Sequence, residues 1–131
     1  MRRLAIVAAA LSVGACGGPA FDSATCKTFM VGTWAGAGTV EMGRSVKTEV
    51  LWVLKADGTF ANDVKYEKAE GGWEDQKTAG TYVAEPGEEK GQCKISQTVV
   101  SDMGSGTGVG RVTVEDKDTI VSFGVTLKRQ P

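Results

Sequence analysis

The sequence predicts an all-β fold: a small antiparallel up-and-down barrel of seven or eight strands that follows a cleaved N-terminal segment. After residue 30, short segments of alternating apolar and polar residues recur about every dozen residues, with turn residues between them. No amphipathic helix of ordinary length is evident in the sequence. The expected strands cover residues 31–41, 45–55, 60–68, 77–84, 92–101, 107–115 and 119–129.

Turn residues and alternation support the first three strands. Asp57 and Gly58 supply the positive φ angles of a tight hairpin between the second strand and the third. One face of the third strand carries Phe60, Asn62, Val64 and Tyr66. Its other face carries Asp63, Lys65 and Glu67, so we expect that charged face to lie outside. Glycines within the first strand predict a bulge or the close approach of another backbone.

The later strands follow the same pattern. Residues 69–76 are expected to form a loop that carries Trp73, and this segment is where an eighth strand would be found. The strand 92–101 places Cys93, Ile95, Gln97 and Val99 on one face. Residues 102–106 are expected to form a glycine-rich turn. One face of the last strand carries Val121, Phe123, Val125, Leu127 and Arg129.

Residues 1–15 are predicted to be a signal peptide. Arg2 and Arg3 form a basic start, and the apolar stretch 4–13 is too short to span a bilayer. The residues Val13-Gly14-Ala15-Cys16 resemble the lipobox of bacterial lipoproteins, in which the signal is removed before a cysteine that then carries the lipid. The alternative is an ordinary secretion signal with an incidental cysteine.

The lipoprotein resemblance divides the chain into a signal peptide (1–15), a lipidated tether and lead-in (16–29) and a barrel domain (30–131). It implies a protein of the bacterial cell envelope that is attached to the membrane by acyl chains such as palmitate on Cys16. Multiple acyl chains are needed because one chain alone binds a membrane only marginally. Gly17 follows the lipidated cysteine, which resembles sorting to the outer membrane, facing the periplasm, in Gram-negative cells.

Two cysteines remain after lipidation, Cys26 and Cys93. An even pair in an oxidising compartment predicts a disulfide between the segment before the first strand and a strand late in the chain. The alternative is two free thiols without a role.

Composition argues against several classes of function. The chain has no histidine, so the commonest general base and metal ligand is missing, and with the cysteines paired no thiol nucleophile remains. The net charge is −1 and the basic residues are scattered, which argues against nucleic-acid binding. The glycine run 104–110 lacks the Gly-Lys-Ser/Thr ending of a phosphate loop. We therefore expect no enzyme activity, no catalytic residue, no metal and no cofactor.

Three short motifs resemble lipocalins, and in particular compact bacterial lipocalin-like lipoproteins. They are the G-x-W motif Gly32-Thr33-Trp34, the hairpin Asp57-Gly58-Thr59-Phe60 and the strand motif Gly80-Thr81-Tyr82. The resemblance implies an up-and-down barrel, usually of eight strands, with a pocket at one end. Two departures are the count of seven clear strands and the missing C-terminal helix of animal lipocalins. Streptavidin-like barrels also begin with Gly-Thr-Trp and are the alternative relatives.

The same resemblance implies a closed barrel end built around the motif tryptophan. In lipocalins a basic side chain from the end of the last strand packs on this indole. The matching positions here are Gly32, Trp34 and Arg129. A guanidinium over an indole ring is favourable by about 0.5–2 kcal/mol.

Two classes of function remain, and both are binding functions. In the first, the barrel binds a small apolar molecule, with the candidate pocket residues Trp52, Asn62, Tyr66, Tyr82 and Gln97 on faces that turn inward. The alternative for these residues is plain core packing. In the second, the protein is an interaction or inhibitor module for another envelope protein, with Trp73 exposed as an anchor residue. The alternative for Trp73 is that it folds back to plug the barrel.

Overall fold

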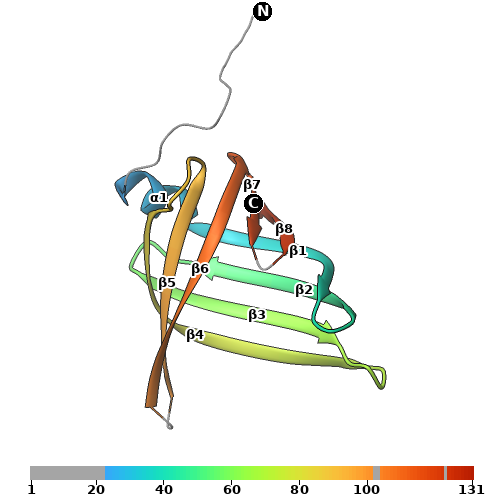
Figure 1. The fold of residues 1–131 in the computed structure, drawn as a ribbon. Helices are drawn as coiled ribbons and strands as arrows, with labels where there is room; N and C mark the ends of the chain where they lie inside the picture. The colour runs from blue at the N-terminus through green and yellow to red at the C-terminus, as the bar shows by residue number, and fades with distance from the viewer. Residues whose placement is uncertain (1–22, 102–103, 123) are drawn as a thin grey trace, which may run out of the picture.

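The computed structural model describes residues 23–101, 104–122 and 124–131, and in it eight antiparallel strands close into a barrel in chain order (Figure 1). The predicted fold class is therefore confirmed. The predicted signal peptide and Cys16 lie outside the described residues. The elements are α1 (Ser23–Met30), β1 (Gly32–Glu41), β2 (Ser45–Leu54), β3 (Thr59–Glu67), β4 (Trp73–Pro86), β5 (Gln92–Ser101), β6 (Gly104–Asp116), β7 (Thr119–Ser122) and β8 (Val125–Arg129).

Alternation along β2 shows how the sequence builds the barrel wall. Val46, Val50 and Trp52 are buried, whereas Lys47 and Glu49 between them are exposed. Because successive side chains of a strand point to opposite faces, this pattern assigns one face to the interior. The hairpin that leaves β2 is the predicted one: Gly58 has a φ of 90°, and the Asp57 carboxylate accepts a hydrogen bond from the Thr59 backbone N–H at 2.9 Å.

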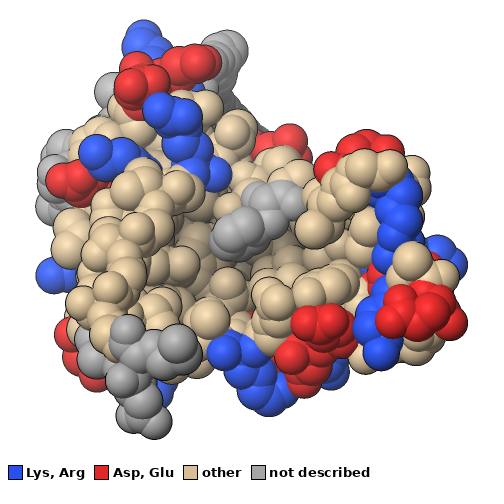
Figure 2. Space-filling model, turned by 60° about the horizontal axis from the view of Figure 1, so that its bottom comes forward, with Lys and Arg blue, Asp and Glu red and all other residues tan. Residues whose placement is uncertain are grey.

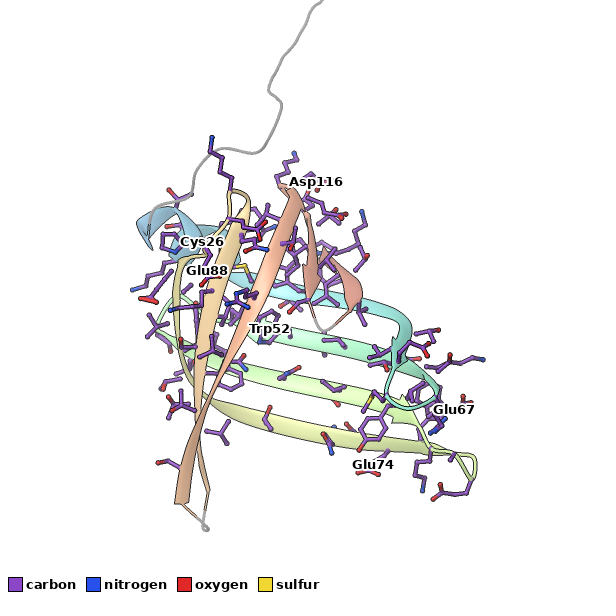
Figure 3. The ribbon with its side chains drawn as sticks, viewed as in Figure 1. Cys26, Trp52, Glu67, Glu74, Glu88 and Asp116 are labelled. Carbon is purple, nitrogen blue, oxygen red and sulfur yellow. A yellow bond between two sulfur atoms is a disulfide. The ribbon has the colours of Figure 1, made fainter. Side chains whose placement is uncertain are left out.

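The helix α1 seals one end of the barrel. Cys26 and Met30 point into the core and are fully buried, so the packed domain already begins within this helix. Cys26 forms a disulfide with Cys93 on β5, with a Cα–Cα distance of 5.9 Å. The predicted disulfide is therefore confirmed, and it ties α1 to the barrel wall (Figure 3).

The eighth strand comes from the last segment of the chain, where the sequence pattern predicted a single strand. The expected strand 119–129 is two strands, β7 and β8, which pair with each other in a hairpin that brings Ser122 opposite Val125. Gly124 has a φ of 73° and allows the reversal. Because of this turn, the residues before it lie on other faces than a single strand would give them. Ile120 and Ser122 are buried, and Val121 lies on the opposite face of the sheet from Leu127. Phe123 lies outside the described residues.

Two further boundaries differ from the sequence-based prediction. Residues 69–76 are not all loop, because β4 begins at Trp73, which pairs with Glu67 of β3. This segment extends β4 and supplies no additional strand. Similarly, β6 already begins at Gly104, within the expected glycine-rich turn.

The barrel is tightly closed at the α1 end and spread apart at the other, which we name the mouth. β4 pairs with β5 only from Gly80 onward, and β6 pairs with β7 only from Thr113 onward. β5 and β6 continue together beyond the rest of the barrel as a long two-stranded ribbon (Figure 1). The short β8 pairs with β1 at Trp34 and Ala35 and crosses close to Gly36, where a Cβ atom would meet the Thr126 carbonyl.

Candidate functional site

A cavity of about 160 Å³ lies inside the barrel on the side of the mouth. Its wall combines an aromatic ring, an amide, aliphatic groups and bare backbone, and it contains no charged side chain. We call it the mouth cavity. It is lined by Trp52, Ile95, Gln97, Gly108, Val109, Gly110 and Ser122.

Trp52 and Gln97 approach each other from β2 and β5. The Trp52 indole Nε1–H donates a hydrogen bond of 2.9 Å to the Gln97 side-chain oxygen. Trp52, labelled in Figure 3, is only 1% exposed. These two predicted pocket residues therefore line one site. Because the side-chain oxygen of Gln97 accepts this hydrogen bond, the amide is held in one orientation. Its side-chain nitrogen, which carries two hydrogens, is available as a donor.

The opposite wall of the mouth cavity is made of glycine. Gly106, Gly108 and Gly110 of β6 stand opposite Val99, Gln97 and Ile95 of β5, so they share the inward face. A Cβ atom on any of the three would have no neighbour within 4 Å among the described residues. We name these three residues the glycine wall. It leaves space along the inner face of β6 where other strands carry side chains.

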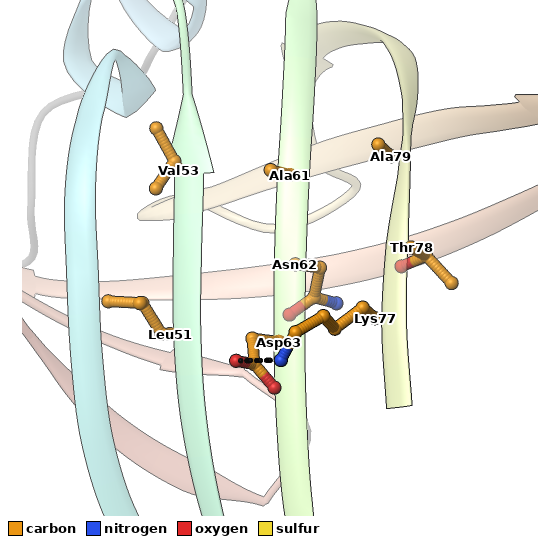
Figure 4. A pocket seen from close by; sticks show the side chains of 8 residues that line it. All are labelled: Leu51, Val53, Ala61, Asn62, Asp63, Lys77, Thr78 and Ala79. Carbon is orange, nitrogen blue, oxygen red and sulfur yellow. Dashed lines mark hydrogen bonds and ion pairs between the residues drawn. The ribbon is translucent and has the colours of Figure 1, made fainter. Parts of the chain in front are cut away.

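Asn62 stands beside Trp52 in the register of β2 and β3. Its side-chain oxygen is buried and has no hydrogen-bond partner among the described residues. An unsatisfied buried oxygen of this kind costs about 1–3 kcal/mol. Asn62 is therefore a neighbour of Trp52 with hydrogen-bonding capacity to spare, but it does not line the mouth cavity and is instead one of the residues that line the hollow in Figure 4.

Neither of the two predicted tyrosines lines the mouth cavity, although Tyr82 stands opposite Gln97 in the register of β4 and β5. The Tyr82 hydroxyl donates a hydrogen bond of 2.8 Å to the Lys55 carbonyl, and burial raises the pKa of Tyr82. Tyr66 lies at the far end of β3, opposite Glu74, and Figure 3 shows Glu74 at that same end of the sheet. Hydrogen bonding to the Glu74 carboxylate raises the pKa of Tyr66. Both tyrosines have structural partners away from the mouth cavity.

The closed end has the packing that the G-x-W motif implied. Trp34 is fully buried, and its indole Nε1–H donates to the Met30 carbonyl at 3.0 Å. The Arg129 guanidinium lies 4.3 Å from the Trp34 ring centroid and donates to the Val31 carbonyl at 2.9 Å and the Phe29 carbonyl at 3.0 Å. Gly32 leaves room for this guanidinium, because a Cβ atom there would lie 3.0 Å from Arg129.

The outer face of the sheet carries a second hollow of about 340 Å³ (Figure 4). Leu51, Val53, Ala61 and Ala79 form its apolar part, and the Asp63–Lys77 ion pair of 3.0 Å borders it. Leu51 is 44% exposed. Trp73, on β4, is 48% exposed and therefore does not plug the barrel.

Charges avoid the centre of the face seen in Figure 2, where the lower side of Figure 1 is turned forward. Lys, Arg, Asp and Glu gather at its margins, and the described residues that are visible nearer its centre are largely uncharged. Within residues 23–101, 104–122 and 124–131, no cluster of three or more potential metal ligands occurs. The helix in this part of the chain is not long and apolar enough to cross a membrane.

The glycine wall is the part of the site that sequence reasoning missed. In the sequence-based prediction, the run 104–110 is divided between a turn and a strand that begins at residue 107, although its glycines recur at every second residue. A period of two is the signature of one strand face, so this spacing was the available signal. Comparison with protein-family models, with curated proteins and with solved structures finds no match.

Proposed function

We propose that the protein is a lipid-anchored protein of the bacterial envelope that binds a small, mostly apolar molecule in the mouth of a lipocalin-like barrel, without catalysing a reaction. The observation that supports it most is the Trp52–Gln97 pair facing the glycine wall. This arrangement offers an aromatic surface, a fixed amide and unfilled space in one uncharged cavity. Pockets of this composition, mostly apolar with a few placed polar groups, are typical of ligand sites.

The volume of the mouth cavity limits what it encloses. Pockets for drug-sized ligands measure roughly 300–1,000 Å³, whereas the mouth cavity measures about 160 Å³. It therefore encloses a ring or a short aliphatic segment rather than a whole large ligand. The remainder of an elongated molecule would lie along the glycine wall, where the inner face of β6 carries no side chains. A polar tip would meet the Gln97 amide.

Replacing Gly108 with valine should abolish this binding without unfolding the protein. The new side chain points into open space inside the mouth cavity, and valine is a better strand former than glycine. We expect the affinity for N-phenyl-1-naphthylamine, an uncharged fluorescent probe, to fall at least about tenfold, which corresponds to roughly 1.4 kcal/mol. The probe is titrated while tryptophan emission is followed, and the thermal midpoint is expected to stay or rise.

The matched control is Thr107→Val, which places the same side chain on the outer face of β6, one residue away. It should bind the probe like the wild type.

Organic extraction of the purified protein should also release a co-purifying small molecule. A wild type that shows neither saturable probe binding nor an extractable molecule would contradict the proposed function, as would equal binding by Gly108→Val.

The lipid anchor is tested separately at Cys16. The lipobox resemblance predicts that cells fed a labelled fatty acid incorporate it into the wild-type protein and not into Cys16→Ser. The unmodified variant is expected to leave the membrane fraction, since the acyl chains provide most of the affinity for the bilayer. Equal labelling of both proteins would show that Cys16 is not the site of lipidation.

A second candidate function is binding of another envelope protein by the outer face of the sheet. Its support is the exposure of Leu51 and Trp73 on that face, since tryptophan is enriched among residues that dominate protein interfaces. This candidate needs no empty cavity. It therefore predicts full binding of the partner by Gly108→Val and loss of binding by Trp73→Ala, the reverse of the pattern expected for a small ligand.

A further inference from the structure

The second edge of β6 is the most unusual feature of the sheet. Over Ser105–Arg111, β6 pairs with β5 on one side, and no strand within the described ranges 23–101, 104–122 and 124–131 pairs with its other side. The residues of this segment are exposed, except for the half-buried Gly110. An exposed edge of this kind presents backbone N–H and C=O groups to any strand that comes alongside.

The hydrogen-bond register shows which backbone groups face that edge. Val114 N–H donates to the Gly91 carbonyl at 2.7 Å, so Val114 points its backbone groups toward the β5 side. Backbone direction alternates along a strand, and β5 and β6 keep one register throughout. It follows that Ser105, Thr107, Val109 and Arg111 direct their N–H and C=O groups to the other edge.

A comparable edge of β4 is protected by charged residues, whereas this one is not. Residues Trp73–Ala79 of β4 also extend beyond the pairing with β5, yet that segment carries Glu74, Asp75 and Lys77. Charged side chains on an edge strand discourage pairing with another chain. In Ser105–Arg111, Arg111 is the only charged residue.

We propose that this edge of β6 binds an extended segment of a partner protein, which adds to the sheet as an antiparallel strand. The chemistry of the segment follows from the two faces of β6. Its inward side chains would lie over the glycine wall, where space is available for bulky apolar groups. Its outward side chain opposite Arg111 would be acidic and would share the guanidinium with Glu88, which lies 3.3 Å from it, while those opposite Thr107 and Ser105 would be polar. Strand addition of this kind combines backbone hydrogen bonds with alternate side-chain pockets.

A second copy of this chain fits the edge less well. Two β6 edges paired with each other would bring glycine against glycine and leave the space over the glycine wall unfilled. A partner with large side chains at alternate positions fills it. The inference goes beyond the binding of a small molecule, because it depends on the backbone of β6 rather than on Trp52 and Gln97.

The test uses a fluorescein-labelled peptide of sequence Glu-Leu-Thr-Leu-Thr-Leu-Thr, whose first residue meets Arg111 in the antiparallel arrangement. Thr107→Pro removes one edge-facing N–H and no backbone bond to β5, and proline is tolerated at such edge positions. It also loses the 3.2 Å hydroxyl contact with Thr98 of β5, which Thr107→Val loses as well. We expect saturable binding by the purified wild type and by Thr107→Val, and at least about tenfold weaker binding by Thr107→Pro. Fluorescence polarisation measures the affinities, and the thermal midpoint of each variant confirms folding.

Hydrogen exchange gives an independent measurement. Addition of the peptide should slow exchange of the Thr107 and Val109 amides, and a peptide of the same composition with its three leucines adjacent should do so much less. Absence of saturable binding, equal affinity of Thr107→Pro, or equal binding of the rearranged peptide would each overturn the proposal. A dimer of the protein alone that Thr107→Pro dissociates would assign the edge to a second copy.

The experiments can reject the small-molecule proposal or the strand proposal without rejecting the other. Thr107→Pro should keep its affinity for N-phenyl-1-naphthylamine, because Thr107 does not line the mouth cavity. Loss of probe binding in Gly108→Val together with unchanged peptide binding in Thr107→Pro would support the cavity and reject the strand. The opposite combination would support the strand and reject the small molecule.

Discussion

Replacing Trp34 with alanine is expected to lower the free energy of unfolding by about 3–5 kcal/mol, the range for emptying the site of a fully buried aromatic side chain. The ring has no exposed surface, and its N–H bond to the Met30 carbonyl joins α1 to β1. Removing the ring also leaves the Arg129 guanidinium without the aromatic face that it covers at 4.3 Å. Urea unfolding followed by circular dichroism measures the loss.

Trp73→Ala is the matched control for this experiment, since it removes the same side chain from a half-exposed position. Surface substitutions of this kind usually change stability by no more than about 0.5 kcal/mol. Similar losses for the two variants would mean that the closed end is not built around Trp34. A third variant, Arg129→Met, keeps the aliphatic part of the side chain and isolates the contribution of the charged group.

The disulfide has the second of the two largest expected effects on stability. Cys26 and Cys93 are separated by 67 residues in the sequence, and closing a loop of this length restricts the unfolded chain by about 4 kcal/mol in the loop-entropy model. We expect the double variant Cys26→Ala, Cys93→Ala to lose stability by about this amount. Denaturation curves of the wild type and the double variant under identical conditions measure the difference.

Cys16→Ser serves as the control for this pair, because Cys16 lies outside the closed loop. It should unfold at the same denaturant concentration as the wild type once both are in the same detergent. A reductant should destabilise the wild type and leave the double variant unchanged. A loss below about 1 kcal/mol in the double variant would show that α1 is held by packing of Met30 and its neighbours rather than by the covalent link.

Much of the fold follows from alternation and turn chemistry. The period of two along β2 and β3 identified the inner face, and Asp57-Gly58 identified a hairpin that the structure contains. The division of the last segment into β7 and β8 escaped prediction for a physical reason. Gly124 reverses the chain inside an apolar run, where it looks like one weak residue within a single strand.

The candidate site was predictable in part. Trp52 and Gln97 were identified because the alternation of their strands places them on inward faces. They lie together because β2 and β5 are across the barrel from each other. Tyr66 has an inward position as well, but distance along β3 separates it from the cavity. Tyr82 stands opposite Gln97, yet its hydroxyl is bound to the Lys55 carbonyl. The face of a strand on which a residue lies does not tell how far along the barrel axis that residue is placed. Depth depends on the stagger of the strands, and in this barrel it depends also on where the pairing between strands ends.

If Cys16 carries acyl chains as proposed, the position of α1 would also determine how the barrel stands on a membrane surface. Six residues, 17–22, separate Cys16 from the start of α1, and a stretch this short reaches at most about 25 Å. With acyl chains on Cys16, the sealed end is therefore held beside the lipid headgroups, and the mouth points toward the aqueous phase. A molecule or strand would thus arrive by diffusion through water, and release into the bilayer would require the whole domain to tip over.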